Sequence, residues 1–377
     1  MCNDGIGIDF DLSKRLWFQW LMQDAAYAHP ILFCISASHC VLAQKPLGKI
    51  EFHHLGKTLT FLKERLSDNA LSAHMSTVCM IMSLVLVFSS LGEHTTARVH
   101  MKPLVEMARL LGGAGTVTYQ SCAKVYLKVV RLVSLFQESR PENNKIMYCM
   151  SSFDLAYSLH CGEMPIFLPT FVPDPSADLC SAQPEIYMQN LLAIFKDLQQ
   201  LATEVNDQDG NPEQLLATKF QNPICMLQYR LWALQGKLAC HDNNMAESLR
   251  LAMLALLGST FRVNGINVRY TYLENALRGC CAAIEPSVPP VYPQDLMSWI
   301  LMVGAISAHA FDETSHAWLL ALWRAENGRM YDTMGWGEMR RRLRNIAWID
   351  SIHDQPGRQA FYVLSSQEDR EAAARSD

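Results

Sequence analysis

The chain has 377 residues, of which 50% are hydrophobic and 18% are charged, and this composition excludes intrinsic disorder for most of its length. Lys and Arg number 32 against 37 Asp and Glu, so the net charge is −5, which argues against a strongly basic nucleic-acid-binding module. A folded chain of this size buries about three quarters of its surface, so its core requires neither disulfides nor a metal.

The cysteines point to a reducing compartment. There are 12 of them, and several lie in apolar runs, as Cys34, Cys79 and Cys225 do. The first ten residues, MCNDGIGIDF, have neither a basic start nor an apolar run, so no secretory signal is predicted. We therefore expect reduced, buried thiols in a nuclear or cytoplasmic protein.

Three stretches lack Asp, Glu, Lys and Arg, namely residues 25–44, 69–92 and 296–311. The first and second contain histidines and other polar residues, and the third is shorter than a bilayer crossing requires. We interpret all three as buried core helices and predict no membrane span.

Helical periodicity dominates the first part of the chain. Helices are expected at residues 16–27, 54–66, 70–91, 96–111, 121–138 and 145–160. The second carries one stripe of Leu55, Leu59, Leu62 and Leu66, and the third is apolar all round, which places it in the middle of the fold. Pro30 and Pro103 are expected to break or kink their helices, or to mark a helix start.

A dense group of prolines then interrupts the pattern, at Pro165, Pro169, Pro173, Pro175 and Pro184. Beyond it, helices are expected at residues 185–205, 213–239, 244–261, 268–284, 295–310, 314–326 and 336–348. No run alternates between apolar and polar residues, so we interpret Asn264-Gly265 as a connection between helices. The prediction is an all-α fold of about a dozen packed helices.

The domain organisation follows from these breaks. We expect an N-terminal tail at residues 1–10, one large helical domain at 11–362 and a frayed C-terminal tail at 363–377. The domain divides into halves at 11–160 and 185–362, which the Pro-rich connection at 161–184 joins.

The sequence contains no convincing phosphate or metal motif. Gly56-Lys57-Thr58 resembles the end of a phosphate-binding loop, but Glu51 stands where that loop needs a glycine. Potential metal ligands occur only in loose groups, and we interpret them as packed or exposed side chains: Cys34 with His39 and Cys40, His53 with His54, Cys280 with Cys281, and His309 with His316. No metal and no cofactor are therefore predicted.

Catalytic patterns are equally weak. There is no G-x-S-x-G sequence, and His160-Cys161 are sequence neighbours, which rarely form the working pair of an enzyme. The acidic run at residues 312–316 lacks the third carboxylate of a magnesium-binding helix. We predict no catalytic residue and no enzyme activity.

One basic cluster stands out, in EMRRRLR at residues 338–344. Its members, Arg340, Arg341, Arg342 and Arg344, could contact nucleic-acid phosphates or serve as a nuclear import signal. The alternative, which we favour, is an exposed helix face with Trp336 and Leu343 pointing inward. The 19 methionines and 8 tryptophans fit core packing, and would also suit an adaptable apolar pocket.

Three segments carry a family resemblance. They are HHLGKTLTFLKERLSD (53–68) with the apolar helix after it, ARVHMKPLVEMARLLGG (97–113), and WGEMRRRLRNIAWIDSIHDQPG (336–357). The second matches the order Ala97, His100, Leu104, Met107 and Gly112-Gly113, and the third is similar to a closing helix with Trp-Ile-Asp and His-Asp. Over residues 11–362 the chain resembles the fungal-specific transcription factor regulatory domain.

The resemblance implies a nuclear, helical regulatory domain that binds protein partners or a small effector; a homodimer is a further alternative. Such domains usually follow a binuclear zinc cluster of six cysteines, and this sequence contains no such set. Direct DNA binding is therefore not expected, unless a further segment supplies the cluster. Pro103 also departs from the family pattern. The alternative functions are a helical binder of lipophilic ligands and an unrecognised metabolic enzyme.

Overall fold

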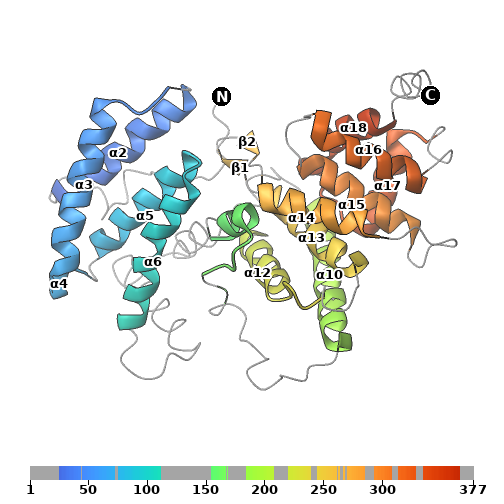
Figure 1. The fold of residues 1–377 in the computed structure, drawn as a ribbon, viewed down its shortest axis with the longest axis horizontal. Coiled ribbons are helices and arrows are strands. Elements are labelled where there is room, and N and C mark those ends of the chain that lie inside the picture. The colour runs from blue at the N-terminus through green and yellow to red at the C-terminus, as the bar shows by residue number, and fades with distance from the viewer. Residues whose placement is uncertain are drawn as a thin grey trace. The chain divides into compact units, whose positions relative to one another are not determined.

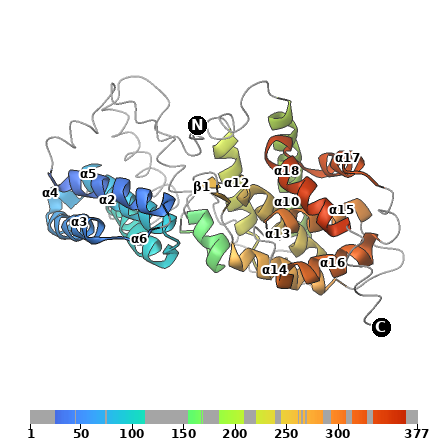
Figure 2. The same ribbon diagram turned by 90° about the horizontal axis from the view of Figure 1, so that it is seen from above.

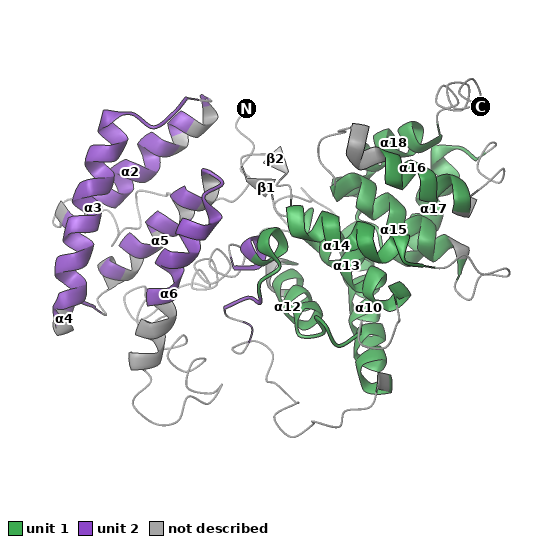
Figure 3. Ribbon diagram, viewed as in Figure 1, with its two compact units in different colours: residues 1–6, 158–163, 174–377 green, residues 7–157, 164–173 purple. Residues whose placement is uncertain are grey.

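A computed structural model describes residues 25–43, 45–72, 75–111, 154–166, 168, 184–207, 220–238, 244–260, 262–263, 266–267, 270–284, 293–307, 313–327 and 334–365. Helices dominate these residues, which confirms the predicted all-α fold. The helix expected at 121–138 and the tail at 1–10 lie outside the described residues. The chain forms two compact units, coloured separately in Figure 3: unit 1 (1–6, 158–163 and 174–377) and unit 2 (7–157 and 164–173).

The helices of unit 2 are α2 (Ala25–Leu42), α3 (Lys49–Ser67), α4 (Asn69–Ser72), α5 (Met75–Ser90) and α6 (His94–Leu111) (Figure 1). The start of α3 has a sequence cause. Gly48 has an extended backbone, and its N–H donates to the carboxylate of Glu51 at 2.7 Å. Glu51, which stands where a phosphate loop needs glycine, thus caps a helix.

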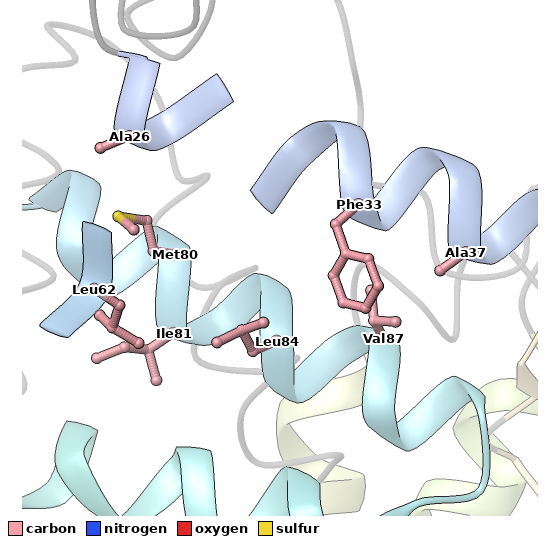
Figure 4. Close-up of a cluster of buried hydrophobic side chains, with 8 residues drawn as sticks. All are labelled: Ala26, Phe33, Ala37, Leu62, Met80, Ile81, Leu84 and Val87. Carbon is pink, nitrogen blue, oxygen red and sulfur yellow. The ribbon is translucent and has the colours of Figure 1, made fainter. Parts of the chain in front are cut away.

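The core of unit 2 is made by α2, α3 and α5. Figure 4 shows Phe33 reaching from α2 toward Val87 of α5, with Leu62 of α3 beside Ile81. Because α5 packs against α2, α3 and α6, it is the central helix of this unit, as its apolar sequence predicted. The leucine stripe of α3 is only partly buried, since Leu59 and Leu66 stay 41% and 40% exposed.

Neither internal proline ends its helix. The α2 helix runs through Pro30, and α6 runs through Pro103 from a start at His94, two residues earlier than expected. Proline removes one backbone hydrogen bond, but burial of neighbours such as Phe33 and Met101 is worth more than that bond. Tertiary packing therefore overrides the local signal.

The helices of unit 1 are α10 (Pro184–Asn206), α12 (Gln221–Trp232), α13 (Asn244–Gly258), α14 (Thr271–Ala282), α15 (Gln294–Ser307), α16 (Glu313–Asn327), α17 (Trp336–Ile346) and α18 (Asp350–Ser365). The α13 helix packs against α10, α12, α14 and α15, and α15 also packs against α16, α17 and α18 (Figures 1 and 2). Both are apolar almost throughout, so they form the centre of the unit. Pro184 begins α10 at the position where proline is favoured.

Two expectations for unit 1 are wrong. Asn264-Gly265 does not join helices: it stands between β1 (Arg262–Val263) and β2 (Ile266–Asn267), which pair antiparallel with Val263 opposite Ile266. Asn-Gly is the strongest dipeptide signal for a two-residue hairpin, even where the strands are too short to alternate. The helix of residues 268–284 accordingly begins only at Thr271.

The C-terminal segment also differs from the expectation. Residues 336–357 are not one closing helix, because α17 ends at Ile346, Ala347 is extended, and α18 begins at Asp350. The α18 helix continues through Pro356 to Ser365, and its Leu364 is buried. The helix thus includes residues 363–365, and residues 366–377 lie outside the described part of the chain.

Candidate functional site

The predicted arginine cluster lies on α17. This helix begins after the extended Gly335 and buries Met339 and Leu343, which are four residues apart and so share one face. The four arginines lie outside that buried face: Arg340 and Arg342 are half-buried, and Arg341 and Arg344 are exposed. The structure thus gathers all four predicted residues on one short helix.

Arg340 and Arg344 connect α17 to the beginning of α18. Arg340 donates from Nη2 to Oδ2 of Asp350 at 2.7 Å, and its Nε lies 2.7 Å from Oδ2 of Asp354. The Nε of Arg344 lies 3.5 Å from the same Asp350 oxygen. Burial, together with neighbouring Asp354, raises the pKa of Asp350, and the two arginines oppose that rise.

Arg341 and Arg342 pair with carboxylates on the other side of the helix. Arg342 donates to Asp295 in the first turn of α15 at 3.1 Å, and to Glu338 one turn earlier in α17 at 3.2 Å. Arg341 also bonds to Glu338. Hydrogen bonds from Arg341 and Arg342 lower the pKa of Glu338, which keeps it ionised.

Every arginine of the cluster therefore contacts a carboxylate of the same unit: Asp295, Glu338, Asp350 or Asp354. A phosphate that bound here would have to compete with these partners for the guanidinium groups. Arg341, whose side chain is 71% exposed, is the most accessible of the four. The inward position of Leu343 agrees with the alternative interpretation of the cluster as a helix face.

The segment between α17 and α18 is fixed from both sides. The Asn206 amide donates to the carbonyl of Trp348 at 2.7 Å and accepts from the N–H of Asp350 at 2.9 Å. The indole of Trp299 donates to the carbonyl of Ala347 at 2.6 Å. The indole of Trp348 donates to Oδ1 of Asp354 at 3.0 Å. This bond orients the Asp354 carboxylate, whose other oxygen contacts Arg340.

Ser259 and His353 are in hydrogen-bond contact in unit 1, and no sequence motif predicts this contact. The Nε2 of the fully buried His353 lies 2.8 Å from Oγ of Ser259. However, the Nδ1 of His353 accepts the N–H of Ile349 at 3.2 Å, so the proton of a neutral ring must be on Nε2. Oγ of Ser259 in turn donates to the carbonyl of Leu256 at 2.7 Å.

This tautomer has a chemical consequence. A histidine that activates serine must accept the serine proton at Nε2, and it usually donates from Nδ1 to a carboxylate. In His353 both roles are reversed, because Nδ1 accepts and Nε2 donates. The pair is therefore arranged as a structural hydrogen-bond chain between α13 and α18, not as a nucleophile with its base.

A second network missed by the sequence analysis lies inside α13. The guanidinium of Arg250, which is 0% exposed, makes two bonds to Glu247, at 2.8 Å and 2.6 Å, and one to the carbonyl of Leu231 at 3.3 Å. The sequence does contain a signal for this ion pair, because Glu247 and Arg250 are opposite charges three residues apart in an otherwise apolar helix. This geometry satisfies both charges in a site without solvent.

The cysteines behave as structural thiols where they are described. Burial raises the pKa of Cys34 to about 11 and that of Cys281 to about 12. Burial, with a contribution from Glu247, also raises the pKa of Cys280. Cys161 is exposed, and His160 beside it is half-buried. The thiols of Cys34, Cys280 and Cys281 are therefore protonated at neutral pH and are poor metal ligands in that form.

The loose groups of potential metal ligands do not assemble in the described residues. The thiol of Cys34 donates to the carbonyl of Ser83, while His39 on the same helix is exposed. Across the described part of the chain, no group of three or more His, Cys, Asp or Glu side chains could hold a metal ion. The side chains of His309 and His316 lie outside it. In the same residues, no helix combines the length and apolarity needed to cross a membrane.

Comparison with known proteins adds no relative. No protein-family model matches the sequence, and neither a curated protein nor a solved structure matches it.

Proposed function

We propose that the chain is a non-enzymatic regulatory domain of the fungal transcription-factor type, which acts in the nucleus by binding protein partners or a small effector. The observation that carries this proposal is the pairing of its only basic cluster. Arg340, Arg341, Arg342 and Arg344 all contact carboxylates of the same unit, which supports a role other than phosphate binding.

The other polar networks support the same proposal. The Glu247–Arg250 pair, the Ser259–His353 chain and the Asn206 amide join helices or fix the segment between them. Each satisfies its hydrogen bonds internally, and the Ser259–His353 tautomer does not suit nucleophilic catalysis. Side chains that could otherwise do chemistry thus maintain a rigid helical framework, as a binding domain requires.

A tethering experiment tests the regulatory function. The full chain is fused to an unrelated DNA-binding domain and tested on a reporter gene that carries the matching site. We expect reporter expression to change by several fold with the fusion and not with the untethered chain. No change in either direction would contradict the proposal.

A mobility-shift experiment tests the statement about DNA. We expect the purified chain to give no sequence-specific band with a randomised duplex pool at physiological salt, because its arginines are already paired. The combined variant Arg341→Ala with Arg344→Ala is the matched control. A specific band that this control abolishes would show that the cluster reads DNA.

A second function, binding of a small effector, is favoured by a separate observation on α12. Gln228 is fully buried, and neither its amide oxygen nor its amide nitrogen has a hydrogen-bond partner in the described residues. The indole N–H of Trp232, one helical turn later, is likewise without one there. Buried unpaired amides cost about 1–3 kcal/mol, so a ligand or water with both donor and acceptor groups would stabilise this site.

Native mass spectrometry of the purified chain tests the effector, together with the variant Gln228→Leu. If an effector binds the amide, we expect a copurified mass that Gln228→Leu removes. If no mass is found and Gln228→Leu raises the unfolding midpoint, the amide is only an unsatisfied core group and this second function fails.

A further inference from the structure

Two histidines from different helices of unit 2 meet through the same ring atom. The Nδ1 of His29 on α2 lies 2.9 Å from the Nδ1 of His54 on α3, and the ring centroids are 5.2 Å apart. Both side chains are half-buried. This distance is that of an N–H···N hydrogen bond. The bond joins α2 to α3 through two residues that are 25 positions apart in the sequence.

Such a bond sets a limit on protonation. One ring must carry hydrogen on Nδ1 and donate it, and the other must have a bare Nδ1 that accepts it. While this bond is intact, the pair can therefore hold at most one positive charge. When both rings are protonated, two N–H groups and two charges face each other at the same point, and the bond becomes a repulsion.

The surroundings make a positive charge still less favourable. From α3, His53 and Lys57 face His29, and the centroid of the His53 ring is 6.1 Å away. The sequences of α4 and α5 contain no Asp, Glu, Lys, Arg or His. The carboxylate of α3 nearest along the helix, Glu51, is bonded to the N–H of Gly48. Burial, His54, His53 and Lys57 together lower the pKa of His29.

We propose that the His29–His54 pair is a proton-sensitive contact, which holds α2 against α3 at neutral pH and opens on acidification, when both rings are protonated. This contact would make unit 2 responsive to acidification, independently of the proposed regulatory function. His39 on α2 is exposed and provides a matched histidine outside the pair.

Histidine ring titration by NMR, on full-length protein labelled at the histidine rings, tests the contact directly. In the wild type, we expect His29, assigned with the variant His29→Gln, to titrate below its ordinary value of about 6.5. The variant His54→Gln removes one neighbouring charge and should raise that midpoint, whereas His39→Gln should leave it unchanged. The same His29 midpoint in the wild type and in His54→Gln would overturn the proposal.

Hydrogen exchange tests the opening of the helices. Between pH 7.5 and pH 5.5, after correction for the intrinsic rate, we expect protection of α2 and α3 amides to fall several fold more in the wild type than in His54→Gln. His39→Gln should behave like the wild type. An equal loss of amide protection in all three proteins would overturn the proposal. Stabilisation of the protein by added Zn²⁺ that His54→Gln abolishes would also overturn it, because the pair would then be a metal site.

Discussion

Arg340 and Asp350 join two helices that the sequence pattern merges into one. The Nη2 of Arg340 on α17 donates to Oδ2 of Asp350, the first residue of α18, at 2.7 Å. Asp350 is also well placed as an anion in the first turn of a helix, where the backbone N–H groups point toward it. The ion pair therefore links α17 to α18 as well as balancing charge.

We predict that Arg340→Ala lowers the free energy of unfolding by about 1 kcal/mol, because it leaves Asp350 and Asp354 close together without their shared cation. The estimate is modest because the Arg340 side chain is 36% exposed, so water replaces part of the lost interaction. Arg341→Ala is the control, since Arg341 is more exposed and, among the described residues, forms an ion pair only with Glu338. Its expected effect is below about 0.5 kcal/mol.

Urea unfolding midpoints of the two variants and the wild type give the comparison. If Arg341→Ala proved as destabilising as Arg340→Ala, the contacts with α18 would not be the stabilising ones.

The buried pair on α13 gives a larger predicted effect. Arg250→Met removes the one cation that bonds to Glu247 among the described residues and leaves a carboxylate in the core, so we expect a loss of about 3–5 kcal/mol. The double variant Glu247→Leu with Arg250→Met removes both charges and should recover most of that loss, because apolar residues of similar volume can replace a buried ion pair. Denaturant unfolding of the single and double variants measures the coupling. A double variant that is less stable than Arg250→Met would contradict this account.

The sequence predicted helices best where an apolar face repeats and the ends are marked. The α10, α13 and α16 helices lie within a few residues of their expected limits. The hairpin of β1 and β2 was missed because two-residue strands are too short for alternation, although Asn-Gly is a turn signal in its own right. The α18 helix was not predicted separately, because residues 336–357 resemble one closing helix. The break at Ala347 and the continuation through Pro356 to Ser365 depend on how buried residues on either side pack.

The candidate site was predictable only in its cationic half. Four arginines within five residues are visible in the sequence, but their partners Asp295 and Asp354 belong to other helices. Which acids approach α17 depends on how α15 and α18 pack, and a single sequence does not encode that in any local pattern. The His29–His54 contact has the same cause: His54 was noticed beside His53, and its true neighbour lies on α2.

Ser259 is predicted to be a structural serine. Its hydroxyl accepts the Nε2 proton of His353, so Ser259→Ala leaves a buried N–H without an acceptor and should cost about 1–2 kcal/mol. We expect no labelling of Ser259 by a fluorophosphonate probe, because His353 cannot remove its proton in this tautomer. Intact-mass spectrometry after probe treatment measures this. Labelling that disappears in Ser259→Ala would show an activated nucleophile and would count against the non-enzymatic function.

Gly357 is predicted to be required for packing at the C-terminus, and not for a turn. A Cβ added there would lie 2.5 Å from Cζ2 of Trp348 and 3.0 Å from Cη2 of Trp336. The two indoles also contact each other edge to face, with their ring centroids 6.4 Å apart. Since the Trp348 indole is also bonded to Asp354, it cannot move aside freely, and Gly357→Ala should destabilise the protein by about 1–3 kcal/mol.

Gly337→Ala is the matched control for Gly357→Ala, because Gly337 is also a helical glycine, but in the described part of the chain no atom beyond its own helix backbone and chain neighbours lies within 4 Å of an added Cβ. Alanine restricts the unfolded chain and favours the helix, so this control should stabilise the protein by up to about 1 kcal/mol. Thermal unfolding of both variants should thus give shifts of opposite sign. A stabilising Gly357→Ala would show that the indoles are not held as tightly as their bonds indicate, and that the segment between α17 and α18 can adjust.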